Sequence, residues 1–262
     1  MGDFDTSVAH PARIYDYWLG GKDNFAADRR AAQEVLAIMP VMASVARANR
    51  MFLATVVRHL AADLGIRQFL DIGTGLPTAD NTHEVAQRAA PQARIVYVDN
   101  DPIVLAHAHA LLKSDPRGAC AYVDADARDT TTILEQAERT LRFDEPVAVV
   151  MLGLLHFIPD PDDPWALTRR VMAATVPGSY LAISQAASDT ADETVAAGAR
   201  AYNGHSATSI TLRSRAEFAR FFDGLELVPP GVAPLGEWSP GRTADDLGPG
   251  HLPTYTALAR KP

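Results

Sequence analysis

The sequence contains one cysteine, Cys120, and this scarcity excludes an intramolecular disulfide. The disulfide framework that marks small secreted domains is therefore absent. The first twelve residues carry neither the basic segment nor the apolar segment of a secretory signal peptide. No apolar run approaches the roughly 20 residues that a membrane-spanning helix needs. Together these absences predict a cytoplasmic protein with no membrane partner.

Positive charge is also scarce. Lys and Arg number 24 against 32 Asp and Glu, which gives a net charge of −8 and an isoelectric point near 5.4. The basic residues are scattered along the chain and form no stripe, so nucleic acid and anionic membranes are disfavoured as partners. With 262 residues, 47% of them hydrophobic, the chain is long enough for one large globular domain with a full core.

The most informative stretch is Arg67–Thr78, with the sequence RQFLDIGTGLPT. Its apolar residues predict a short strand over 69–72 that turns sharply through Gly73 and Gly75. A helix is expected to follow the turn. A strand that ends in a glycine turn and feeds a helix leaves bare backbone at the carboxyl edge of a parallel sheet. That edge is where open α/β sheets bind their ligands.

The polar groups around this turn bear on which ligand it accepts. A dinucleotide site prefers G-x-G-x-x-G, whose helix N–H groups hold a pyrophosphate. Here Thr78 takes the place of the third glycine, and Pro77 removes an N–H donor. Asp71 would repel a phosphate. A ligand without phosphate and with some positive charge suits the turn better, as does S-adenosylmethionine with its sulfonium, α-ammonium and ribose.

At this point the chain resembles a known family. Asp71–Gly75 is similar to the D-x-G-x-G loop of the class I S-adenosylmethionine-dependent methyltransferases. Arg13–Asn24 followed by Asp71–Thr78 resembles, more closely, an actinobacterial S-adenosyl methyltransferase family once catalogued as a domain of unknown function. The resemblance covers nearly the whole chain. It implies an enzyme with S-adenosylmethionine as cofactor and an α/β, Rossmann-like fold, with a mostly parallel sheet and an antiparallel last strand.

The organisation of the chain follows from its periodicity. Residues 1–64 are helical in pattern and predict an N-terminal helical cap or lid, and residues 65–262 predict the S-adenosylmethionine-binding core. A substrate-facing insertion is expected at 185–212. Capping-box spacing predicts helix starts at the pairs Asn81 and Glu84, Thr132 and Glu135, and Ser214 and Glu217. Strands are expected at 69–72, 93–98, 119–123, 146–152, 179–184, 225–228 and 254–259.

Two glycines and one acid form the centre of the expected cofactor site. The missing side chains of Gly73 and Gly75 would let backbone touch the amino-acid tail and the ribose of the ligand. Asp99 ends the next strand, where a carboxylate can accept hydrogen bonds from both ribose hydroxyls. Its separation from Gly73 is close to the ~20-residue spacing of the dinucleotide fingerprint, so spacing alone does not separate the two cofactors. The alternative role for Asp99 is that of a turn aspartate.

The resemblance also implies an adenine contact after the third strand. It assigns the carboxylate of Asp126 to the adenine amino group and the N–H of Ala127 to a ring nitrogen, with Asp124 as a competitor. The aromatic N-terminal run Arg13–Asn24 is either a lid that closes over the cofactor or a helix docked by its aromatic side chains. The expected cofactor-binding set is completed by Tyr15, Tyr17, Asn24, Asp71, Thr74, Asn100 and Leu152.

His156 is the candidate catalytic residue. It stands in Leu152–Phe157, a segment that resembles the Leu-His pattern of many small-molecule methyltransferases. A histidine can take a proton from a hydroxyl or amine nucleophile. Alternatively it is a packed residue that holds the loop 159–164, because alignment can supply most of the rate of methyl transfer without a base. No metal site is expected, since His107 and His109 are two residues apart on a helix and face different sides.

These observations lead to a functional hypothesis with two alternatives. The hypothesis is S-adenosylmethionine-dependent methyl transfer to an oxygen or nitrogen atom of a small molecule, with tRNA and DNA disfavoured by the acidic charge. The first alternative is a regulatory protein that binds S-adenosylmethionine without catalysis. The second is a dinucleotide-dependent oxidoreductase, disfavoured by Asp71, Pro77 and Thr78.

Overall fold

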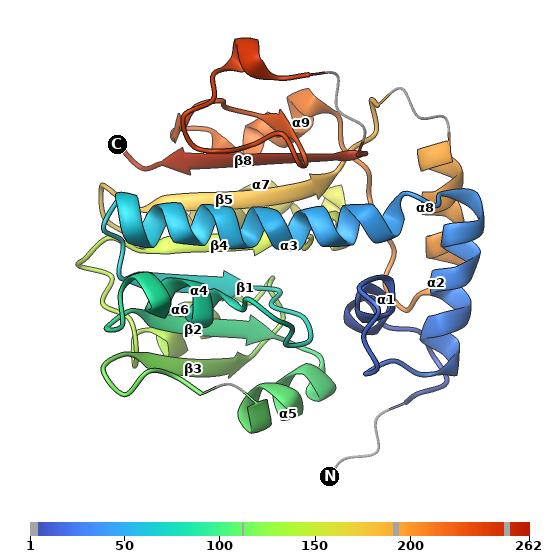
Figure 1. The fold of residues 1–262 in the computed structure, drawn as a ribbon, viewed down its shortest axis with the longest axis horizontal. Coiled ribbons are helices and arrows are strands. Elements are labelled where there is room, and N and C mark those ends of the chain that lie inside the picture. The colour runs from blue at the N-terminus through green and yellow to red at the C-terminus, as the bar shows by residue number, and fades with distance from the viewer. Residues whose placement is uncertain (1–4, 112, 191–193, 249–251) are drawn as a thin grey trace.

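The computed structural model describes residues 5–111, 113–190, 194–248 and 252–262 and shows one mixed β-sheet between helices (Figure 1). The strand order is β3-β2-β1-β4-β5-β8-β6, and β7 also pairs with β8. Five strands are parallel, β1 (Gln68–Ile72), β2 (Arg94–Asp99), β3 (Ala119–Asp124), β4 (Ala148–Leu152) and β5 (Tyr180–Ala186). Three are antiparallel to their neighbours, β6 (Glu226–Leu227), β7 (Ala233–Pro234) and β8 (Thr254–Arg260).

This sheet confirms the expected fold class. The mostly parallel sheet with an antiparallel last strand is present, and the seven expected strands lie within about two residues of their predicted bounds. β7 was not expected, because two residues that include a proline carry no readable period. The last strand β8 lies between β5 and β6, so the end of the chain is built into the sheet.

The central strands are buried on both faces. In β1, Leu70 and Ile72 belong to one core cluster, and Phe69 belongs to the cluster on the opposite face. Side chains alternate across a strand, so a strand covered on both sides must be apolar at nearly every position. That requirement explains the near-continuous hydrophobic runs in the sequence.

The described helices are α1 (Pro11–Trp18), α2 (Ala26–Ile38), α3 (Met42–Arg58), α4 (Thr82–Ala89), α5 (Pro102–Leu111), α6 (Thr130–Ala137), α7 (Pro164–Ala173), α8 (Thr194–His205) and α9 (Arg215–Ala219). None of these is by itself long and apolar enough to cross a membrane; only α2 together with Met42–Asp63, a pair bent by 104°, passes that test.

Helix starts follow the capping signals with one exception. The capping boxes that begin α4 and α9 are confirmed. The pair Thr132 and Glu135 does not begin a helix. Instead α6 begins earlier, because the carboxylate of Asp129 accepts a hydrogen bond from the backbone N–H of Thr132 at 3.0 Å.

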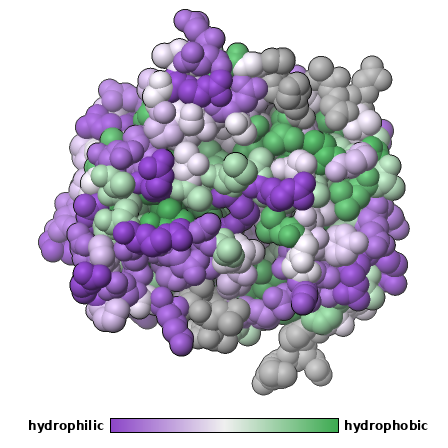
Figure 2. Space-filling view, viewed as in Figure 1, coloured by the Kyte–Doolittle hydropathy of each residue, from purple (hydrophilic) through white to green (hydrophobic). Residues whose placement is uncertain are grey.

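The N-terminal helices occupy two different places. α3 lies along the sheet, where Phe52, Val56 and Val57 pack in the same cluster as β1 and β2. α1 and α2 lie beyond the carboxyl ends of the parallel strands and share a separate cluster with Tyr202 of α8 (Figure 1). Figure 2 shows hydrophobic surface gathered over the side where α2 and α8 lie. A small second core therefore covers the edge of the sheet at which ligands bind.

Gly118 and Gly204 form a matched pair for testing the packing of the sheet. A Cβ on Gly118 would lie 2.4 Å from the Ala93 carbonyl oxygen and 2.7 Å from that of Pro91, whereas a Cβ on Gly204 of α8 would meet nothing within 4 Å. We expect Gly118→Ala to lower the free energy of unfolding by about 1–3 kcal/mol. Gly204→Ala should be neutral or raise it by up to about 1 kcal/mol. Urea unfolding of both variants checks this, and equal effects would contradict the clash at Gly118.

Candidate functional site

A cavity of about 300 Å³ lies at the carboxyl ends of the parallel strands. The loops after β1, β2, β3 and β4 all contribute to its lining, and α1, α2 and α8 close the opposite side. Gly73 and Asp99, on neighbouring strands, share this cavity. Of the expected site residues, those in the lining are Tyr15, Asp71, Gly73, Thr74, Gly75, Asp99, Asn100, Asp126, Ala127, Leu152 and His156.

The glycine turn after β1 is fixed in position from two sides. Gly73 has a φ of 76° and Gly75 a φ of 68°, a backbone region that favours glycine. A Cβ at Gly73 would also lie 2.7 Å from the Cδ1 of Leu154 and would push that side chain aside, so the backbone conformation favours a glycine and the space adds to the preference. The N–H of Gly73 donates to the Val98 carbonyl at 2.8 Å, and this bond ties the turn to the end of β2.

Asp99 is joined directly to the same turn. One carboxylate oxygen accepts a hydrogen bond from the Gly75 N–H at 2.8 Å, and the other accepts one from the Asp101 N–H at 3.0 Å. Burial raises the pKa of this carboxyl above its ordinary value. Each oxygen of a carboxylate has a second lone pair. Asp99 can therefore still receive two hydroxyl groups from a ligand in the cavity.

Asp71 is the second acid on this side of the cavity. It is buried at the end of β1, where its carboxylate accepts a hydrogen bond from the Thr82 hydroxyl at 2.6 Å. Burial raises the pKa of Asp71 to about 6, and the charge of Asp99 acts in the same direction. Two neighbouring carboxyls, here the buried Asp71 and the half-buried Asp99, are stabilised in their charged form by a cation. The cavity thus favours a ligand with positive charge near Asp71.

After β3 the structure separates Asp126 from Asp124. Asp126 lines the cavity, whereas Asp124 is exposed and lies outside the lining. Hydrogen bonds from Arg128 hold the carboxylate of Asp126 and lower its pKa. Arg128 also pairs with Asp162 at 3.2 Å, which connects this loop to the segment after β4.

A polar network that the sequence did not predict lies in the wall of the cavity. The Tyr15 hydroxyl donates to the Ala46 carbonyl at 2.9 Å and accepts from the amide of Asn49 at 3.2 Å. The Ser184 hydroxyl donates to Asn49 at 2.7 Å and accepts from the Gly153 N–H at 2.8 Å. The network joins α1, α3, β5 and the loop after β4. In the sequence, the only indication of this network is the polar Asn49 on the apolar face of the expected helix.

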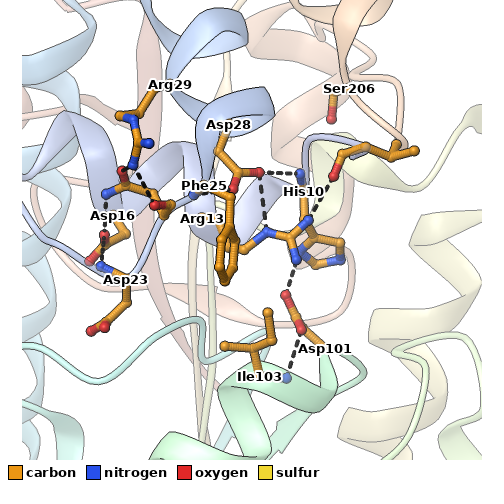
Figure 3. A network of polar contacts seen from close by, with 12 residues as sticks. His10, Arg13, Asp16, Asp23, Phe25, Asp28, Arg29, Asp101, Ile103 and Ser206 are labelled. Atoms are coloured by element: carbon orange, nitrogen blue, oxygen red, sulfur yellow. Dashed lines mark hydrogen bonds and ion pairs between the residues drawn. The ribbon is translucent and has the colours of Figure 1, made fainter. Parts of the chain in front are cut away.

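Tyr17 and Asn24, expected to contact the cofactor, lie outside the cavity lining. The Tyr17 hydroxyl accepts a hydrogen bond from Gln33, and the Asn24 amide donates to Asp16 at 2.7 Å. Figure 3 shows the surrounding polar groups, which pair mostly with one another. Asn24 thus fixes the bend after α1, and Tyr17 joins α1 to α2.

The N-terminal segment is attached to the core next to Asp99. The imidazole of His10 lies 2.9 Å from the carboxylate of Asp101, which also accepts a hydrogen bond from the Ile103 N–H at 2.8 Å (Figure 3). The buried guanidinium of Arg13 pairs with Asp28 at 3.1 Å. These contacts hold α1 and α2 over the cofactor side of the cavity.

His156 lies on the short 3₁₀ turn Leu155–Phe157 and lines the cavity. Its Nδ1 is buried and has no hydrogen-bond partner among the described residues. Burial, assisted by the charge of Arg213, lowers the pKa of His156 to about 3. The ring is therefore neutral at physiological pH, and no carboxylate of the described chain fixes its tautomer.

Arg213 holds the turn that carries His156, and sequence reasoning missed it. Its buried guanidinium donates to the carbonyls of Leu155 at 2.8 Å and Ile158 at 2.7 Å and pairs with Asp160 at 2.8 Å. The guanidinium also lies over the ring of Trp165, 5.2 Å from its centroid. Because these partners come from one short segment, Arg213 sets the position of His156 in the cavity.

Comparisons with known proteins agree with this geometry. The family model described as S-adenosyl methyltransferase matches residues 1–262. A DUF574 family protein from Streptomyces avermitilis is 45% identical over 98% of this chain and 99% of its own, with a TM-score of 0.92. A protein from Thermobifida fusca, described as a candidate methyltransferase, is 40% identical over 98% and 96%, with a TM-score of 0.88. Mitomycin 7-O-methyltransferase, at 16% identity over 99% of this chain and 74% of its own, shares the fold with a TM-score of 0.55. No curated protein matches the chain.

Because His156 is buried and neutral, the free energy of unfolding should depend on pH. Between pH 6.5 and about 3 the unfolded chain binds a proton at this histidine that the folded chain does not, so acidification favours unfolding. We expect the free energy of unfolding to fall more steeply from pH 7 to pH 4 in the wild type than in His156→Gln. Urea unfolding at each pH measures the two slopes. Parallel curves would show that the histidine titrates alike in both states.

Proposed function

We propose that this chain, which belongs to the S-adenosyl methyltransferase family, methylates an oxygen or nitrogen atom of a small molecule. The family gives the activity and the methyl donor, S-adenosylmethionine, and the proposal concerns the acceptor. The observation that supports it is a single cavity in which Gly73, Asp99 and Asp126 line one side and His156 with apolar side chains lines the other. A concave cavity of about 300 Å³ suits a small molecule better than a polymer.

The residues of the cofactor side fit the donor. When bound, S-adenosylmethionine supplies a methyl group on a sulfonium, which is displaced in line and leaves a neutral thioether. Asp99 has lone pairs for the two ribose hydroxyls, and the bare backbone at Gly73 and Gly75 allows close approach. Asp126 and the Ala127 N–H would receive the adenine edge. The positive charge that Asp71 favours is present in the sulfonium and the ammonium.

Arg50 is a candidate partner for the negatively charged carboxylate of S-adenosylmethionine. It lies on α3, lines the cavity, and donates from Nη2 to the carbonyls of Ala79 at 3.1 Å and Asp80 at 3.0 Å. Its Nε is buried with no hydrogen-bond partner among the described residues. Arg50 and Asp71 interact electrostatically across the cavity wall. We assign the carboxylate of the methionine group to Arg50 and its ammonium to Asp71.

On the acceptor side the chain supplies a hydrogen-bonding ring and a lid. The ring of His156 stays neutral and can hold the acceptor by a hydrogen bond, whereas its pKa of about 3 makes it a weak base, so alignment supplies most of the rate. We propose that α1 and α2 act as the lid expected of residues 1–64, with Tyr15 and Trp18 of α1 and Val35 of α2 among their contacts to the cavity. Closure by the lid excludes water from the reacting atoms.

A regulatory protein that binds S-adenosylmethionine would use the same cofactor residues, so turnover separates the two functions. An enzyme releases S-adenosylhomocysteine faster when its acceptor is present. A panel of hydroxylated and amino small molecules, assayed for S-adenosylhomocysteine release, tests the proposal. Binding of the donor with no acceleration by any small molecule would favour the regulatory function.

Asp99→Ala should weaken binding of S-adenosylhomocysteine by about 1.5–3 kcal/mol, or roughly 10- to 150-fold, because two charge-assisted hydrogen bonds to the ribose are lost. Isothermal titration measures the affinity. Asp124→Ala is the matched control, since Asp124 ends the adjacent strand outside the cavity and should bind like the wild type. Unchanged affinity in Asp99→Ala would remove the ribose assignment.

Arg50→Gln should weaken binding of S-adenosylhomocysteine at least tenfold and leave 5′-methylthioadenosine unaffected, because the smaller ligand has no carboxylate. Asp99→Ala, by contrast, should weaken both ligands. Arg47→Gln, one turn earlier on α3 and exposed, is the control. A similar loss for both ligands in Arg50→Gln would show that Arg50 supports the glycine turn instead of the carboxylate.

A further inference from the structure

Among the described residues, charged side chains line only one part of the cavity. We define its lid half as the lining residues contributed by α1, by α2 with Met39, by α8 and by 208–212. The described lining residues of this half include no Asp, Glu, Lys or Arg. Every lining residue with a formal charge at neutral pH comes from α3, from the carboxyl ends of β1 and β2 or from the loop after β3, namely Arg50, Asp71, Asp99, Asp126 and Arg128.

The lid half is instead apolar and rich in rings. Within this half the ring centroid of Tyr202 lies 6.4 Å from that of Trp18. Phe157, on the turn after β4, borders the half, with its ring centroid 6.1 Å from that of Tyr202 and 4.3 Å from that of His156. Val35 and Met39 complete this wall from α2. Aromatic walls favour flat rings, which gain contact area and offset stacking. A methionine thioether adapts to ligands of different shape.

A charged acceptor would lose its hydration in this half without gaining a partner. Burial of an unpaired ion is strongly unfavourable, whereas burial of apolar surface contributes about 25 cal/mol per Å². A protonated amine would need a carboxylate, and Asp71, Asp99 and Asp126 already face the donor. The neutral imidazole of His156 offers a hydrogen-bond acceptor suited to a hydroxyl.

We propose that the acceptor is an uncharged, largely apolar ring compound that presents a hydroxyl group to His156. This inference rests on the proposed methyl transfer and narrows it to an oxygen atom. In the reaction the hydroxyl oxygen bonds to the methyl carbon, and the carbon–sulfur bond breaks with its electron pair going to sulfur. His156 accepts a hydrogen bond from the hydroxyl, whose proton goes to water as the new bond forms, and this leaves a methyl ether, S-adenosylhomocysteine and one released proton.

Binding to the protein saturated with S-adenosylhomocysteine tests the acceptor class without requiring turnover. The probes share one ring system and differ in charge, namely 2-naphthol, 2-naphthoate and 2-naphthylmethylammonium. We expect 2-naphthol to bind at least tenfold more tightly than either ion in isothermal titration. Equal or tighter binding of an ion, or no binding of 2-naphthol at millimolar concentration, would overturn the proposal. Failure of S-adenosylhomocysteine itself to bind would instead count against the proposed function.

Two variants locate the binding site. Ile210 is half-buried in the lid half, and its backbone is held by two hydrogen bonds to Asn203. Ile210→Glu should reduce the preference for 2-naphthol over the ammonium probe at least tenfold. Ile38→Glu, 37% exposed on α2 and outside the lining, is the matched control and should keep the wild-type preference. Loss of preference in both variants, or in neither, would contradict the assigned location.

The hydroxyl contact has its own test. His156→Phe keeps a ring of similar size and removes the hydrogen-bond acceptor. We expect the wild type to bind 2-naphthol at least fivefold more tightly than naphthalene and His156→Phe to bind the two alike. The comparison within each protein cancels any change in the apolar pocket. A preference that persists in His156→Phe would show that another group receives the hydroxyl.

Discussion

The hydrogen bond from the Gly75 N–H to the carboxylate of Asp99 joins two neighbouring strand ends into one surface, and the rest of the site is arranged around it. It requires a glycine turn in the left-handed backbone region and an acid at the end of β2, side by side in a parallel pair. Parallel strands deliver their carboxyl ends to the same edge, so residues separated in sequence meet there. The N-terminal segment then attaches next to this bond through His10 and Asp101.

The two sides of the cavity differ in charge. On the side formed by the sheet, several acids line the cavity, and a nearby cation would stabilise their ionised form. The raised pKa of Asp71 reflects the cost of ionising this buried carboxyl. The lid side is built from rings and aliphatic side chains, and burial keeps even His156 neutral. In the proposed complex a zwitterionic, cationic donor and an uncharged acceptor would occupy opposite ends of one space. Arg213 makes this possible, because it holds the turn of His156 through backbone carbonyls.

Much of the fold and part of the candidate site could be predicted from the sequence. Strand ends were readable because buried parallel strands are continuously apolar and stop at polar turns, and this placed Asp99 and Asp126 at the right edge. Asn49, Arg50 and Ser184 were missed, since their role depends on how α3 is rotated against the sheet. The directions of Tyr17 and Asn24 depend on the bend after α1, which local sequence does not determine.

The position of β8 has a consequence for how the chain reaches its final form on the ribosome. Until Thr254–Arg260 leaves the exit tunnel, β5 has an unpaired edge and β6 and β7 have no strand to join. Exposed edges of this kind invite pairing with other chains. Nascent protein is therefore open to misassembly until β8 has been synthesised, and a translation pause shortly before that strand would prolong the exposure.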